Sequence, residues 1–191
     1  MKRLFGSFGM CAVCVTTALG ASAQAFPAKP IRMVVPFAAG GATDTFSRAL
    51  AAELTNSLGQ QVIVENRTGA GTTIGADVVA KAAPDGHTLL FTDLATHTIT
   101  ASLYTKLPYH PLRSFAAVAA ANSSPLLLVV HPSVGVKSVK ELIALAKRRP
   151  GIACGNSGVG TVTHMTAEKF RMREIPAIGE TLKGVEGAVI S

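Results

Sequence analysis

The chain has 191 residues, of which 48% are hydrophobic and 15% are charged. This composition excludes a disordered chain, because it supplies enough apolar surface for a buried core, and the length suits one domain or two small ones. The net charge of +7 is spread along the sequence, which has no Trp and two Tyr. Since nucleic-acid-binding proteins concentrate their basic residues and interleave aromatic ones, we expect no nucleic-acid partner.

Residues 1–25 have the pattern of a secretory signal peptide. Lys2 and Arg3 form the basic region, an apolar stretch follows, and small residues at Ala23 and Ala25 favour cleavage before Phe26. The apolar stretch is too short and too rich in Thr and Gly for a stable membrane span. The sequence therefore predicts export to the periplasm.

After the signal peptide, strand and helix patterns alternate. Short apolar runs predict buried strands at 31–37, 61–66 and 87–92. Helices are expected at 42–58 and 75–83, and the first carries a four-residue stripe of Phe46, Leu50, Leu54 and Leu58 that ends at Gly59. Such alternation with short turns predicts an α/β fold in which helices flank a parallel sheet.

The second half begins with apolar runs at 114–121 and 125–131, which predict two more strands. A helix follows, with Ser138 as its N-cap, Glu141 reaching back to that cap, and Pro150–Gly151 as its stop. Its expected buried face is Val139, Leu142, Ile143 and Ala146. A short strand, a glycine-rich turn and a helix from about Thr163 then repeat the opening pattern.

Glycines mark the turn between the first strand and the first helix. Gly40 and Gly41 allow backbone N–H groups at the positive end of the helix dipole to meet an anion without any lysine. Asp44 lies in the first helical turn, where its carboxylate suits that dipole. A tight turn with Asp44 as a simple cap remains an equal alternative at this point.

Two later turns resemble nucleotide sites but depart from them. Gly69, Gly71 and Gly75 form G-x-G-x-x-x-G, one residue longer than a dinucleotide fingerprint. The turn 155–161 has the glycine spacing of a phosphate loop, but threonine stands in place of its lysine. Ser157 and His164 leave a serine hydrolase open as an alternative, although we favour a hydroxyl that contacts a ligand and a histidine that packs on or caps the helix.

The stretch 92–98 (TDLATHT) follows the third predicted strand and is dense in hydroxyl groups. In an open parallel sheet, ligands bind beyond the carboxyl ends of the strands. The strand ends after 37, 92 and 154 could therefore converge on one cleft that holds a small polar anion. No His/Cys cluster has metal-ligand spacing, and we expect neither a metal nor a cofactor.

Five stretches occur in the order found in one known family: FPAKPIRMVVPFAAGGATD, QVIVENRTGAGTTIGADVVAKAAPDGHTLLF, ASLYTKLPYHPLRSFAAVA, HPSVGVKSVKELIALAKRRPG and GNSGVGTVTHMTAEKF. They resemble the periplasmic substrate-binding proteins of tripartite tricarboxylate transporters, the Bug or TctC-like family. The resemblance runs from about Phe26 to Arg171. It implies a type II periplasmic-binding-protein fold whose two α/β lobes close over a small carboxylate held by backbone amides, and no enzymatic activity.

The resemblance also implies the partners and the site. The protein would act as a monomer that delivers its ligand to membrane transporter subunits. The first lobe would contribute the loop 37–44 and the loop 92–98, and the second lobe would contribute the turn before its last helix. The implied ligand-binding residues are Phe37, Ala38, Gly40, Gly41, Asp44, Thr92, Asp93, Thr96, Thr98, Ser157, Gly158, Gly160, Thr161 and His164.

The chain departs from the family mainly in length, since family members are roughly twice as long. Thr100 and Ser114 also replace the common Asn and Asp. We expect a first lobe at 26–121, a partial second lobe at 122–172, and at 173–191 a segment that resembles a later part of the family. An incomplete second lobe would impair binding, and a non-functional remnant remains a further alternative.

Overall fold

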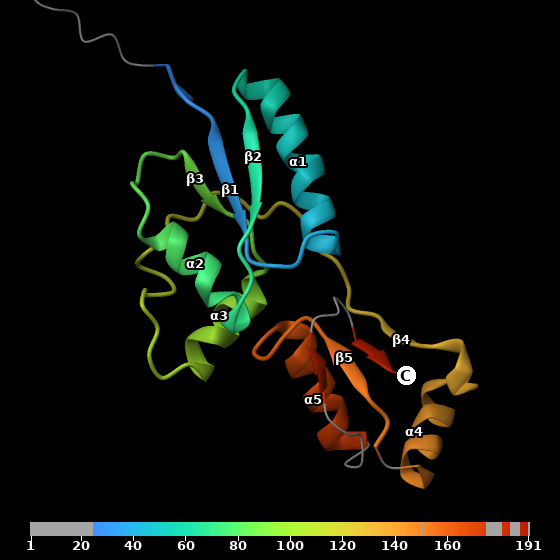
Figure 1. The fold of residues 1–191 in the computed structure, drawn as a ribbon. Coiled ribbons are helices and arrows are strands. Elements are labelled where there is room, and N and C mark those ends of the chain that lie inside the picture. The colour runs from blue at the N-terminus through green and yellow to red at the C-terminus, as the bar shows by residue number, and fades with distance from the viewer. Residues whose placement is uncertain (1–24, 150, 175–180, 184–187, 191) are drawn as a thin grey trace, which may run out of the picture.

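The computed structural model describes residues 25–149, 151–174, 181–183 and 188–190. The signal peptide predicted at 1–25 therefore lies almost entirely outside the described residues. The strands sort into two separate sheets, each with its own helices (Figure 1). No helix in the described ranges is long and apolar enough to cross a membrane.

The first sheet consists of β1 (Ile31–Val35), β2 (Val62–Asn66) and β3 (Thr88–Leu90), in the order β2-β1-β3. Both pairs are parallel, and Met33 of β1 lies opposite both Val64 and Leu89. The three predicted strands are confirmed, and all three are shorter than expected. Because β1 is central and covered on both faces, its consecutive residues Met33, Val34 and Val35 are all buried.

Helix α1 (Ala42–Leu58) has the bounds that the sequence predicts, and Gly59 ends it in the left-handed conformation with φ 67°. The N–H of Gly59 donates to the carbonyl of Thr55 at 3.1 Å. The expected apolar stripe is only half-buried, and Leu58 is exposed. The residues buried most deeply are Asp44, Ser47 and Ala51, because small side chains let the helix approach the sheet closely.

Two short helical elements follow β2. The 3₁₀ turn η1 (Ala70–Thr72) leads into α2 (Thr73–Ala80), which begins earlier than the predicted helix. Helix α3 (Leu94–Leu103) was not predicted, since 92–98 was interpreted as a loop. Asp93 caps α3 by accepting a hydrogen bond from Thr96 N, so this hydroxyl-rich stretch is a helix start.

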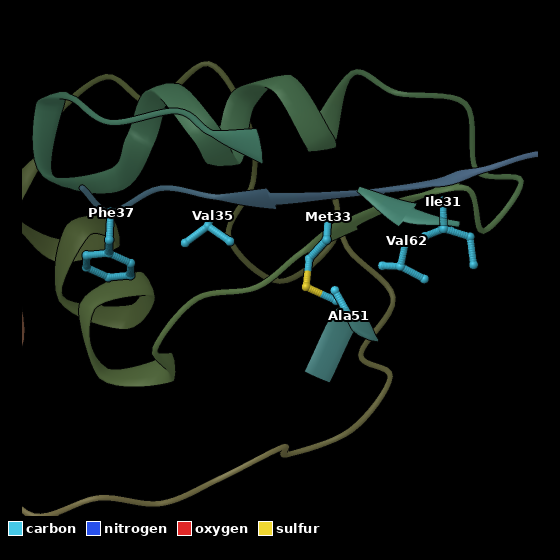
Figure 2. Close-up of a cluster of buried hydrophobic side chains, with 6 residues drawn as sticks. All are labelled: Ile31, Met33, Val35, Phe37, Ala51 and Val62. Atoms are coloured by element: carbon cyan, nitrogen blue, oxygen red, sulfur yellow. The ribbon is translucent and has the colours of Figure 1, made fainter. Parts of the chain in front are cut away.

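The core of the first sheet lies between β1, β2 and α1. Ile31, Met33, Val35 and Phe37 point from β1 and the residues after it toward the same side, where Ala51 of α1 packs (Figure 2). Val62 of β2 completes the cluster. Helix α2 covers the opposite face (Figures 1 and 2). This packing fixes where β1 ends and therefore where the turn into α1 lies.

The segment 104–127 crosses from α3 to the second sheet. The strand predicted at 114–121 is wrong: those residues have no regular structure, and nearly all are exposed, including Val118 at 83%. An apolar run forms a strand only where a neighbouring strand accepts its backbone hydrogen bonds, and no described strand lies beside it. Of the run 125–131, only β4 (Leu128–Val130) is a strand.

The second sheet has the order β4-β7-β5-β6, with β5 at Cys154–Asn156, β6 at Thr181–Lys183 and β7 at Ala188–Ile190. Strands β4 and β7 are parallel, as are β5 and β6, whereas β5 and β7 are antiparallel. The all-parallel arrangement therefore holds for the first sheet, and the second sheet is mixed.

Helices α4 (Val139–Arg148) and α5 (Val162–Glu174) accompany the second sheet, and the 3₁₀ turn η2 (Pro132–Val134) precedes α4. Ser138 Oγ accepts the N–H of Glu141 at 3.2 Å, which confirms the predicted N-cap. The Glu141 carboxylate reaches back to Lys137 N at 2.8 Å, one residue before the cap. Leu142 and Ala146 are buried with Ile152 and Cys154, but Val139 is 50% exposed, so its predicted burial is wrong.

Candidate ligand-binding site

The turn between β1 and α1 is held by a buried carboxylate. Asp44 is 2% exposed, and its Oδ2 accepts hydrogen bonds from Gly40 N at 2.8 Å and Arg48 Nε at 2.9 Å. Its Oδ1 accepts Asn66 Nδ2 at 2.9 Å. The Arg48 bond, helped by the other two, lowers the pKa of Asp44 to about 2, although desolvation acts in the opposite direction. Asp44 is therefore ionised at neutral pH and bound within the turn.

Asn66 ties this turn to the neighbouring strand. It is the last residue of β2, and its Nδ2 also donates to the carbonyl of Phe37 at 3.1 Å. Its Oδ1 accepts Arg48 Nη2 at 2.9 Å. Neither Asn66 nor Arg48 is among the site residues predicted from the sequence. Asn66 could have been predicted as part of the site, because it is a polar residue at the carboxyl end of a strand.

The outer part of the same turn is open. Ala38 and Gly40 are exposed, and Gly40 has φ 83° with no atom near the position of a Cβ. Gly41 is the N-cap of α1 and has no side chain to cap it. The first-turn N–H groups of a helix have no intrahelical acceptor, so the backbone of this turn presents the positive end of the dipole toward its surroundings.

In the second turn, after β3, some polar groups are hydrogen-bonded within the turn and one has no partner. Thr96 N donates to Asp93 Oδ1 at 2.5 Å, and Thr98 Oγ1 donates to the carbonyl of Leu94 at 2.8 Å. The hydroxyl of Thr92 is buried and has no hydrogen-bond partner among the described residues. His97 lies away from the turn, since its Nε2 is 2.8 Å from the carbonyl of Pro111 and its ring packs against Tyr109 and Phe115.

The third turn, between β5 and α5, is stabilised by hydrogen bonds of hydroxyl groups. Ser157 Oγ lies 2.6 Å from Thr163 Oγ1 and 3.3 Å from Thr161 Oγ1. Thr161 Oγ1 donates to the carbonyl of Gly158 at 2.7 Å and accepts His164 N at 3.3 Å. Several of the groups that were predicted to contact a ligand are therefore hydrogen-bonded within the turn.

The hydrogen bonds of Ser157 and His164 do not join the two side chains. His164 Nδ1 accepts the N–H of Gly160 at 3.3 Å, while the Ser157 hydroxyl bonds to Thr161 and Thr163. A nucleophile and its base need a direct hydrogen bond or a position within reach of one. In the described structure, His164 instead holds the backbone of Gly160, and the Ser157 hydroxyl joins the hydroxyl groups of Thr161 and Thr163.

Asn156 is a further residue of the third turn that the sequence analysis missed. It ends β5, is fully buried, and accepts the N–H of Gly158 through Oδ1 at 2.8 Å. Its Nδ2 has no partner among the described residues. A buried amide donor without a partner costs free energy, so this atom, like the Thr92 hydroxyl, suits a water or a ligand atom.

The second and third turns meet directly. Val162 N, at the start of α5, donates to Thr96 Oγ1 of α3 at 3.0 Å, and Thr96 is fully buried. The two helices lie side by side where the two sheets approach each other (Figure 1). The first turn lies at the carboxyl end of β1, the strand that neighbours β3. No described group of three or more His, Cys, Asp or Glu residues could hold a metal ion.

Comparison with known proteins identifies relatives along most of the chain. Residues 46–179 match the model of the TctC family, described as the tripartite tricarboxylate transporter family receptor. Protein BugT of Bordetella pertussis is 41% identical over 180 residues, which cover 93% of this chain and 55% of BugT.

Solved structures show the same fold. MatC from Rhodopseudomonas palustris with bound malate has a TM-score of 0.76 and 34% identity, over 85% of this chain and 55% of MatC. The periplasmic binding protein BugD has a TM-score of 0.67 and 31% identity, over 84% of this chain and 54% of BugD. An R. palustris protein solved with adipate has a TM-score of 0.69 and 28% identity, over 85% of this chain and 54% of that protein.

These similarities confirm the α/β fold of the periplasmic binding proteins that the sequence predicted. The chain spans about half the length of the curated relatives it matches. The matched family region nevertheless includes most of α1, all of α2 to α5, and the second and third turns of the candidate site. The chain belongs to the tripartite tricarboxylate transporter receptor family.

Proposed function

We propose that this protein is an extracytoplasmic solute-binding receptor that captures a small carboxylate for a tripartite tricarboxylate-type transporter. The observation that carries the proposal is the junction of the second and third turns through Thr96 and Val162, in a chain of this receptor family. The malate and adipate named for two of the similar structures indicate the ligand class. BugD is a periplasmic protein, which supports the same location for this chain.

In this proposal the residues around the first sheet (26–121) and those around the second (122–172) act as two lobes with the ligand between them. Strands β6 and β7, which lie within 173–191, would belong to the second lobe, since they join its sheet. The carboxylate would lie beside the backbone of Phe37, Ala38, Gly40 and Gly41, where the dipole of α1 favours negative charge. Because Gly40 N already donates to Asp44 and Gly41 N to the Ala38 carbonyl, the attraction at these two glycines would come from the dipole. Asp44 would act indirectly, because its own charge is already neutralised within the turn.

The unpaired buried atoms at the two other turns would supply neutral donors. Thr92 Oγ1 and Asn156 Nδ2 have no partner among the described residues, and a carboxylate oxygen would satisfy either of them. Ser157, Gly158, Gly160, Thr161 and His164 would shape the second-lobe wall, with Asp93 and Thr98 fixing the start of α3. Delivery to membrane transporter subunits would follow closure around the ligand.

Isothermal titration calorimetry against mono-, di- and tricarboxylates tests the proposal. We expect saturable binding of at least one small dicarboxylate at low salt. Gly41→Val should weaken it at least tenfold, because the extended backbone of Gly41 (φ −74°) accepts a β-branched residue that then fills the mouth of the turn. Equal melting temperatures would show that the variant is folded. Unchanged affinity in the folded Gly41→Val variant would refute the placement of the site, and no binding by the parent protein would refute the function.

A further inference from the structure

The turn Ala70–Thr72 is strained, and the three other turns do not explain it. Its residues Ala70, Gly71 and Thr72 have φ values of 44°, 59° and 79°, all in the left-handed region. Residues other than glycine adopt this region at a cost, and they keep it only where the surrounding structure holds them there. The turn belongs to the glycine-rich stretch whose spacing does not fit a nucleotide site.

This left-handed turn lies against the second sheet's glycine turn. A Cβ on Gly71 would come within 2.6 Å of the carbonyl oxygen of Val159 and 3.0 Å of Tyr104 Oη. The first of these is a backbone atom, which cannot rotate away. A Cβ on Gly160 would meet Leu103 Cδ1 at 3.3 Å. Backbone from one half of the chain therefore approaches backbone from the other half more closely than any side chain at 71 allows.

The hydrogen bond from Val162 N to Thr96 Oγ1 lies in the same contact. Two further hydrogen bonds orient Thr96. The Asp93 carboxylate accepts the N–H of Thr96, and the Thr96 carbonyl accepts the hydroxyl of Thr100. The Val162–Thr96 bond gives an acceptor to a backbone N–H at the N-terminus of α5 that has none within its own helix. One contact thus combines a buried interlobe hydrogen bond with a close approach that only glycine permits.

We propose that Gly71 and Thr96 are positioning residues that form a latch with residues 158–162 and set the closed geometry of the cleft. The inference rests on the proposed function, since it assigns these residues to closure of the two lobes. Opening would break the Thr96–Val162 bond and part the left-handed turn from Val159. Because apparent affinity depends on the fraction of molecules in the binding-competent state, the latch would contribute to affinity without touching the ligand.

Amide hydrogen exchange of Val162, measured residue by residue by NMR without ligand, tests the latch directly. We expect slow exchange in the parent protein, an acceleration of roughly fivefold or more in Thr96→Val through loss of one buried hydrogen bond, and parent-like exchange in Thr96→Ser. Gly71→Ala should also accelerate Val162 exchange. Its matched control is Gly59→Ala, which has a similar φ of 67° but open space around the new Cβ.

Parent-like exchange in Thr96→Val, or equal effects of Gly71→Ala and Gly59→Ala, would overturn the latch. A second arm measures dicarboxylate affinity, which should fall roughly fivefold in Thr96→Val and recover in Thr96→Ser. Unchanged affinity in Thr96→Val would also overturn it, because closure would then not depend on this bond. Absence of binding in the parent protein would count against the receptor function alone, since the exchange measurement needs no ligand.

Discussion

Replacing Asp44 by Asn tests whether the buried carboxylate stabilises the first turn. An amide matches the carboxylate in shape but offers only one acceptor oxygen, so its NH₂ group must face either the donors Gly40 N and Arg48 Nε or the donor Asn66 Nδ2. The pKa of Asp44 falls from 3.8 to about 2 in the folded protein. At 1.36 kcal/mol per pKa unit, the charged form contributes about 2 kcal/mol to the free energy of unfolding.

The pH dependence follows from the direction of this shift. Because the folded pKa is depressed, the contribution is complete above the unfolded value near 3.8 and is lost as the pH falls toward 2. We expect Asp44→Asn to lower the free energy of unfolding by about 2 kcal/mol at pH 7. The difference from the parent protein should shrink steadily between pH 4 and pH 2.

Urea denaturation followed by far-UV circular dichroism, at several pH values from 7 to 2, measures this difference. Asp85→Asn is the matched control, since Lys29 also lowers the pKa of Asp85 to about 2 but its side chain is 39% exposed. Water screens that pair, so its effect should be clearly smaller and more sensitive to salt. A loss at Asp44 that does not exceed that at Asp85, or one that stays constant between pH 7 and pH 2.5, would refute the reasoning.

Three other substitutions test the packing and capping that position the site. Gly75→Ala should destabilise by about 1–3 kcal/mol through overpacking, because its Cβ would lie 2.8 Å from both the Arg67 carbonyl oxygen and Pro36 Cβ; a melting temperature equal to that of the parent would contradict this. Leu142→Ala should cost about 2–5 kcal/mol in urea denaturation, since the side chain is 2% exposed in the second core, and a loss below about 1 kcal/mol would argue against that core. Ser138→Ala should cost about 1 kcal/mol through loss of the bond to Glu141 N, and Ser123→Ala, at an exposed position of the irregular segment 104–127, serves as the comparison that should change stability less.

Local signals predicted much of the fold. The predicted bounds of α1 agree with the structure to the residue, with Gly59 at its end, and Ser138 predicts the start of α4, which ends at Arg148. Of the stop predicted at Pro150–Gly151, Pro150 lies outside the described residues. Helix α3 was missed because Thr and His are weak helix formers and the Asp93 cap was not recognised. The run 114–121 was mistaken for a strand because its apolar pattern cannot reveal whether a partner strand exists.

The sequence predicts a position for the candidate site, which stays a prediction, but it does not predict the hydrogen bonding there. Glycine turns and hydroxyl-rich strand ends are the signals for that position. They do not reveal that Asn66, from another strand, holds Asp44, or that Thr163 takes up the Ser157 hydroxyl. They also do not reveal that Gly71 lies against Val159. Those contacts join segments far apart in sequence or depend on side-chain direction, which only the folded chain determines.

The most direct measurement of the central claim is an NMR titration of backbone amides with a small dicarboxylate such as malate. If peptide N–H groups at strand-to-helix turns receive the carboxylate, the amides of residues 37–44, 92–98 and 157–164 should shift together and saturate at one ligand per chain. Shifts confined to the basic end of α4, at Lys147–Arg149, or shifts that never saturate, would show that the anion is attracted only to surface charge and would contradict the account.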